Sequence, residues 1–150
     1  MSKRLLSYLA CPSTFSMIYE DDVVSFTLDK QVPCLVFTAK RLLASDEVKS
    51  CLVKSQELRL QLKAKYPYLN LLMDIRKAGA REVTDFEYYI QEHMAKAYES
   101  GLEKVAIVVP DDMYALVTYE SFIGQVADSP IRHELFGTQA QARQWLRDAG

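Results

Sequence analysis

The chain has 150 residues, 49% of them hydrophobic, which is enough apolar mass for one globular domain with its own core. Its 18 basic and 20 acidic residues give a net charge of -2, and this argues against a nucleic-acid partner, because binding phosphates needs a basic face. Three widely spaced cysteines, Cys11, Cys34 and Cys51, fit neither a disulfide framework nor a zinc ribbon and indicate a reducing compartment. No apolar run approaches the ~18 residues of a membrane span, so we expect a cytoplasmic protein.

The N-terminal part of the chain predicts a hairpin that follows a loosely ordered segment. Residues 1–14 are expected to dock loosely, and residues 15–150 to form a single domain. Residues 15–28 contain two short runs rich in β-branched and aromatic residues. Asp21 and Asp22 lie between these runs, where they would form the turn.

A third strand and a long helix are predicted next. The apolar run from Cys34 to Phe37 has no polar alternation, which is typical of a strand that is covered on both faces. Ser45 is expected to cap the following helix, with acidic residues in its first turn. Pro67 ends that helix, because the residue before a proline avoids the helical region.

The centre of the chain, from Tyr68 to Pro110, predicts a βαβ unit. Two short apolar runs, at 69–74 and 104–109, flank a segment that is long enough for a right-handed crossover helix. Thr84 opens a Thr-Asp-Phe-Glu capping box, and Gly101 can end the helix in the left-handed conformation. The expected inward face of this helix consists of Phe86, Ile90, Met94 and Ala97.

The C-terminal part predicts helix, strand and helix. Asp111 or Asp112 can cap the first helix, and Thr138 opens a second capping box before the last one. Residues 131–136 alternate as an edge strand. The first helix is expected to bury Met113, Leu116, Val117, Ile123 and Val126, and the last helix Ala142, Trp145 and Leu146.

The resulting order β-β-β-α-β-α-β-α-β-α, over roughly residues 15–148, resembles a known family. The strand ending in Met-Asp-Ile-Arg-Lys at 73–77, the Val-Ala-Ile-Val-Val-Pro strand at 105–110 and the closing run at 136–146 look like the SpoIIAA-like branch of the STAS superfamily (sulfate transporter and anti-sigma-factor antagonist domains). The resemblance implies one α/β domain with a central mixed sheet, in which N-terminal antiparallel strands precede βαβαβα units. Its motifs are core patterns, so they indicate fold more than function.

The sequence departs from this family at the phosphorylation site. In phospho-switched STAS proteins the strand matching residues 68–74 is followed by Asp-Ser-Ser/Thr-Gly, and a partner kinase phosphorylates a Ser. Here Asp74 is followed by Ile75, Arg76 and Lys77, and no hydroxyl occurs before Thr84. The phospho-switch therefore cannot be transferred to any residue of this chain.

No pattern in the sequence indicates a catalytic, metal or cofactor site. His93 and His133 are far apart and lack ligand spacing, so we expect packed or surface histidines. Cys34 in a strand and Cys51 on a helix stripe are expected to be core residues. No nucleophile elbow or glycine-rich phosphate loop is present. We therefore predict no catalytic residue, no metal and no cofactor.

The candidate binding surface is the edge where the parallel strands end. Ligands of open α/β sheets bind beyond the carboxyl ends of the strands, and the basic loop 76–81 follows such an end and leads into a helix N-terminus, which favours anions. The candidate ligand- or partner-binding residues are Asp74, Arg76, Lys77, Arg81, Thr84, Asp111, Asp112 and Thr138. A solvated turn is the alternative interpretation of the loop.

Two functions remain open from the sequence. The first is a non-enzymatic regulatory or interaction module of STAS-like type that binds a protein partner or a small anionic ligand at this edge. The second is a lipid- or ligand-binding domain of the Sec14-like kind or an uncharacterised enzyme, which would need a deep apolar pocket. Homo-oligomerisation is left open.

Overall fold

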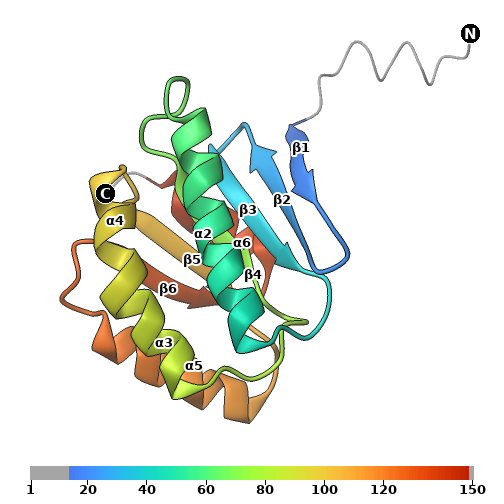
Figure 1. The fold of residues 1–150 in the computed structure, drawn as a ribbon, viewed down its shortest axis with the longest axis vertical. Coiled ribbons are helices and arrows are strands. Elements are labelled where there is room, and N and C mark those ends of the chain that lie inside the picture. The colour runs from blue at the N-terminus through green and yellow to red at the C-terminus, as the bar shows by residue number, and fades with distance from the viewer. Residues whose placement is uncertain (1–13, 149–150) are drawn as a thin grey trace, which may run out of the picture.

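A six-stranded mixed sheet, with its strands in chain order, forms the centre of the computed structural model, which describes residues 14–148 (Figure 1). Antiparallel pairing joins the first three strands, and parallel pairing joins the third to the sixth. The strands are β1 Phe15–Glu20, β2 Val24–Asp29, β3 Cys34–Ala39, β4 Asn70–Asp74, β5 Lys104–Val108 and β6 Arg132–Phe136. The predicted α/β class with N-terminal antiparallel strands is confirmed, whereas the prediction for residues 1–13 lies outside the described residues.

Helices cover both faces of the sheet (Figure 1). The helical elements are α2 Ser45–Leu62, α3 Val83–Tyr88, η1 Tyr89–His93, α4 Met94–Glu99, α5 Met113–Gln125 and α6 Gln139–Arg147. All but α6 pack on one face in the larger core, and α6 packs on the other face. The central strands carry apolar side chains on both faces because they serve both cores: Leu71 points to the larger core, and the adjacent Leu72 to the smaller.

The acidic turn of the first hairpin lies where it was predicted, and it has a specific structure. The Asp21 carboxylate accepts hydrogen bonds from the backbone N–H groups of Val23 at 2.8 Å and Val24 at 2.9 Å. An aspartate that bonds its own backbone two or three residues on stabilises a turn without glycine. The hairpin prediction is therefore confirmed.

Two predicted helix caps are wrong by one or two residues. The helix α2 is capped at Ala44, so Ser45 is its first helical residue, and the Glu47 carboxylate accepts a hydrogen bond from the Ala44 N–H at 3.0 Å. The helix α3 is capped at Glu82, and Thr84 lies exposed inside its first turn. In both helices an acidic side chain three residues on satisfies the first N–H, so no hydroxyl cap is needed.

The crossover helix contains a π-helical turn, η1, between α3 and α4. A π turn holds more residues than an α turn, so the inward register shifts across it. The predicted inward face is correct at Phe86 and Ala97, but Tyr89 and His93 replace Ile90 and Met94 as the buried residues between them. Gly101 ends the helix at φ 103°, as predicted.

The buried face of α5 also differs from the prediction. Met113 and Val117 are exposed, and Leu116 and Ile123 are only half-buried. Val126 is buried as predicted, together with Ala115, Tyr119 and Phe122. Tyr119 and Phe122 contact the Phe86 ring, with centroids 5.4 and 5.0 Å apart. The aromatic side chains bury more area than the aliphatic ones, so they decide which face turns inward.

The last helix begins and packs largely as predicted. Thr138 caps α6 by accepting a hydrogen bond from the Gln141 N–H at 3.2 Å, and Ala142 and Leu146 are buried. Trp145 is only half-buried, with its ring 5.6 Å from that of Phe136.

Candidate functional site

The loops after the four parallel strands meet at one edge of the sheet. Hydrogen bonds of 3.0 Å join Ile75 N–H to the Val108 carbonyl and Val109 N–H to the Phe136 carbonyl. A third bond of the same length joins the loop after β3 to the loop after β4. We call this edge the strand-end rim and define it as residues 40–44, 75–82, 109–112 and 137–138. The parallel pairing of β4 with β5 on which the sequence hypothesis depended is confirmed.

Asp74 lies just below the rim and is fully engaged by its neighbours. Its carboxylate accepts hydrogen bonds from the Arg76 guanidinium at 2.6 and 3.0 Å and from the Gln139 side chain at 2.8 Å. Burial alone would raise the pKa of Asp74, but these hydrogen bonds outweigh it, so the pKa lies below its usual value. Asp74 therefore links β4 to the start of α6. The positive charge of Arg76 is balanced by the carboxylate of Asp74.

Arg81, the second arginine of the predicted basic loop, is turned into the protein. Its side chain is only 7% exposed and lies 3.3 Å from the Asp85 carboxylate, which is 4% exposed. The guanidinium also donates to the carbonyls of Leu43 at 2.5 Å and Ala78 at 3.1 Å. The interpretation of Arg81 as a solvent-facing rim cation is wrong, because three protein acceptors draw it inward between two loops.

The remaining predicted site residues lie at the rim surface or act as helix caps. Lys77, Thr84 and Asp111 are exposed, and Asp112 caps α5 by accepting a hydrogen bond from the Tyr114 N–H at 3.0 Å. Thr138 is a cap in the same way. The structure thus gathers the predicted residues along one edge, but it leaves few of them free to bind.

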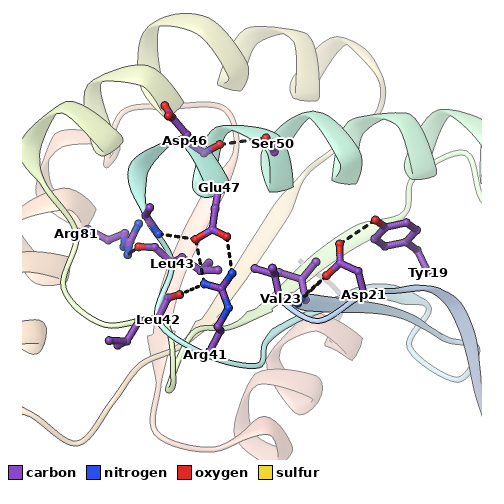
Figure 2. Close-up of polar contacts among 12 residues, drawn as sticks. Tyr19, Asp21, Val23, Arg41, Leu42, Leu43, Asp46, Glu47, Ser50 and Arg81 are labelled. Atoms are coloured by element: carbon purple, nitrogen blue, oxygen red, sulfur yellow. Dashed lines mark hydrogen bonds and ion pairs between the residues drawn. The ribbon is translucent and has the colours of Figure 1, made fainter.

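The loop between β3 and α2 is held in place by an ion pair. Figure 2 shows Glu47 facing Arg41, with bonds of 2.7 and 3.1 Å between them. The Arg41 guanidinium also donates to the Leu42 carbonyl at 2.7 Å. Because Arg81 bonds the next carbonyl along, that of Leu43, the loop is fastened from both sides.

Below the rim, the larger core contains an interior cavity of about 80 Å³. It lies between the sheet and the helices α2, α3 and α5, whose residues line it together with the loops of the rim. Its polar lining side chains are Cys51, Ser55, Arg81, Asp85, Tyr89, Tyr119 and His133. Sequence analysis missed this constellation, because its members come from elements that are remote in the chain.

One edge of the cavity carries a tyrosine–histidine hydrogen bond. His133 Nδ1 lies 3.0 Å from the Ile131 carbonyl, to which it must donate, so the Tyr89 hydroxyl donates to His133 Nε2 at 2.6 Å. Burial lowers the pKa of His133 to about 4, and burial and then Arg59 lower that of His93 to about 4. Both imidazoles are therefore neutral near pH 7. Ile131, just before β6, and His133 and Leu135 on β6 alternate toward the core, and this alternation is the signal that could have placed His133.

The surroundings of Cys34 and Cys51 make both thiols unreactive. Burial raises the pKa of the Cys34 thiol to about 12 and that of Cys51 to about 11. A thiol that stays protonated at neutral pH is a weak nucleophile, and Cys34 is a core residue as expected, while Cys51 is half-buried beside the cavity.

Residues 14–148 contain neither a metal-binding cluster nor a membrane-spanning helix. No three histidine, cysteine or acidic side chains of this part of the chain come together as a metal-binding group. None of its helices combines the length and the apolar character needed to cross a membrane.

The chain is similar to a crystal structure of an uncharacterised protein from the DUF3478 family, described as having a SpoIIAA-like fold, from Shewanella loihica PV-4. The two chains are 15% identical, the match covers 88% of this chain and 91% of that chain, and the TM-score is 0.46. No family model and no curated protein matches the chain. A likeness of this size carries no argument about the family or the function of this chain.

Proposed function

We propose that this chain is a non-enzymatic interaction module that binds a protein partner through the strand-end rim. The observation that carries the proposal is a set of large hydrophobic side chains left in solvent on the rim and on the first turns of the helices that leave it. Their exposed fractions are 70% for Leu42, 67% for Val83, 76% for Met113, 68% for Tyr114 and 58% for Val117. Apolar side chains gathered at one edge are typical of protein-binding surfaces.

The charges of the rim favour a protein over a small anion. Arg76 is paired with Asp74, and Arg81 with Asp85, so two of the three predicted rim cations are already neutralised. Lys77 and Asp111 are exposed and of opposite sign. A surface with exposed hydrophobic side chains and a few charges of both signs matches the apolar centre and polar margin of protein interfaces.

Lipid binding, the alternative function, is less well supported. Pockets for ligands of that size are typically ~300–1,000 Å³ and mostly apolar. The interior cavity has about 80 Å³, and a groove of about 280 Å³ between β1, β2 and α2 is lined by Asp21, Asp46, Glu47 and Lys54 among others. An acyl chain would not be expected beside four charged side chains.

The proposal is tested with paired variants in a cross-linked pull-down from the native source. One variant, Leu42→Asp with Met113→Asp, places charges on the rim. The control, Leu60→Asp with Tyr68→Asp, changes side chains that are 51% and 68% exposed at the opposite end of the sheet, where α2 ends and β4 begins. Both are surface changes, so we expect both proteins to fold with circular dichroism spectra like that of the unchanged chain.

A partner that the unchanged chain and the control both recover, and that the rim variant loses, would support the proposal. A partner recovered equally by both variants would refute it. Size-exclusion chromatography with light scattering gives a separate check: if the rim variant alone dissociates a homodimer, the occupant of the rim is a second copy of this chain and the proposal of a different partner is wrong.

A further inference from the structure

We propose that the interior cavity below the rim binds a small neutral molecule with a carboxamide or hydroxyl group on a compact apolar body. The cavity carries this inference independently of partner binding at the rim. Two buried polar atoms among its lining residues have no hydrogen-bond partner in the described protein: Arg81 Nε, a donor, and Asp85 Oδ1, an acceptor.

The two unpartnered atoms belong to side chains that are otherwise well held. Asp85 Oδ2 accepts from Arg81 Nη1 at 3.3 Å and from the Glu82 N–H at 3.2 Å. Both side chains are more than nine-tenths buried, so bulk water does not reach the free atoms. Buried donors and acceptors are nearly always paired in folded proteins, and two free ones beside a single cavity indicate a missing partner.

The charge state of the pair selects a neutral partner. An anion near Arg81 would also meet the Asp85 carboxylate, and a cation near Asp85 would also meet the guanidinium, so either would lose through repulsion much of what it gains. A single group that donates to Asp85 Oδ1 and accepts from Arg81 Nε satisfies both atoms without a net charge. Carboxamides and hydroxyls are such groups.

The rest of the cavity fits an apolar body. Apart from the polar groups already named, it is lined by aliphatic and aromatic side chains that include Ile75, Phe86, Ile107 and Phe122. Its volume of about 80 Å³ equals the liquid volume of roughly two or three waters, which limits the ligand to a few non-hydrogen atoms. The half-buried Met73 also lines the cavity, and the flexible side chain of methionine can yield to a slightly larger ligand.

Three probes with one two-carbon skeleton test the proposal: acetamide, acetate and ethylammonium at pH 7. Binding is followed by two-dimensional NMR through the Arg81 Nε–Hε resonance and the methyl resonances of Leu43 and Ile75, both of which line the cavity. We expect acetamide to shift these signals saturably and the two charged probes to bind about tenfold more weakly or not at all. Saturable shifts with equal affinity for all three probes would overturn the proposal.

Two variants test where the probe binds and whether the charge of Asp85 selects a neutral probe. Asp85→Asn keeps an acceptor for the Glu82 N–H but leaves the Arg81 charge unpaired, so preference should move from acetamide to acetate by about tenfold. Ser55→Leu places a larger side chain on a cavity-lining position of α2 and should abolish the shifts caused by acetamide. An unchanged preference in Asp85→Asn, in a variant with an unchanged melting temperature, would contradict the assignment.

If either variant fails to fold, a crystal of the unchanged chain soaked in acetamide tests the proposal directly. Density for the amide within hydrogen-bond distance of Arg81 Nε and Asp85 Oδ1 would support the proposal. Ordered water alone at these atoms, or the additive bound only elsewhere, would overturn it.

Discussion

The stability of this fold should fall between pH 7.5 and pH 5 because of two histidines. His93 is 6% exposed and His133 is half-buried, and each ring lies 5.6 Å from that of Tyr89. Both histidines have a pKa of about 4 in the folded chain against 6.5 in the unfolded chain. The unfolded state therefore takes up protons first as the pH falls. A lowered folded-state pKa gives stability that is fully present above pH 6.5 and is lost progressively towards pH 4.

The expected loss can be worked from these pKa values. Between pH 7.5 and pH 5, proton linkage gives about 2 kcal/mol for each histidine whose pKa falls from 6.5 to about 4. The two together give about 4 kcal/mol, a large share of the ~5–15 kcal/mol that stabilises a typical domain. Asp74, whose pKa is also lowered, loses its contribution only below about pH 4, so it does not overlap with this window.

The measurement is urea unfolding at pH 7.5, 6.0 and 5.0, followed by the fluorescence of the chain's one tryptophan. Since the sequence contains only two histidines, the double variant His93→Gln with His133→Gln removes them all. Its free energy of unfolding should vary by less than about 1 kcal/mol over this range, whatever its absolute stability. A flat profile in the unchanged chain, or an equally steep one in the double variant, would refute the reasoning.

Two further predictions concern glycines and the tryptophan. Gly101→Ala should cost about 1–3 kcal/mol, because φ is 103° there and a Cβ would lie 2.4 Å from the Pro67 carbonyl oxygen. Gly124→Ala is the matched control. It lies within α5, where an added Cβ would meet nothing beyond its own helix within 4 Å, so the change should stabilise by about 0.5–1 kcal/mol. Equal melting-temperature changes in the two variants would contradict this account. Trp145→Ala should cost about 2 kcal/mol in urea unfolding, less than the ~3–5 kcal/mol of a fully buried aromatic, because the ring is half-buried; a cost at the full value would show that it belongs to the core.

The order of strands and helices could be predicted from local patterns. The apolar runs at β3, β4 and β5 indicated strands covered on both sides, and Gly101 and Thr138 marked helix ends through their own backbone and side-chain chemistry. These features depend on residues within a few positions of one another. The parallel pairing of β4 and β5 could also be predicted, because the segment between them is long enough for a helical crossover, and such crossovers join parallel strands.

The fine register of the helices could not be predicted in the same way. Acidic side chains at Glu47 and Asp85 moved two helix starts away from the expected hydroxyl caps. The π turn η1 brings Tyr89 and His93 to the buried face of the crossover helix. On α5, aromatic packing places the face that carries Tyr119 against the core. Each choice is a competition between alternatives of similar local energy, and contacts with the rest of the core decide it.

The sequence by itself determined the α/β class, the order of strands and helices along the chain and the edge at which the candidate site residues gather, since periodicity and chain connectivity act over short distances along the chain. Only the tertiary structure decided which of those residues are free. Arg81 turns inward to the Leu43 carbonyl, 38 residues away, and Tyr89 bonds His133, 44 residues away. Such pairs form because buried polar groups must find partners wherever the fold brings one within reach, and no local pattern records that distance.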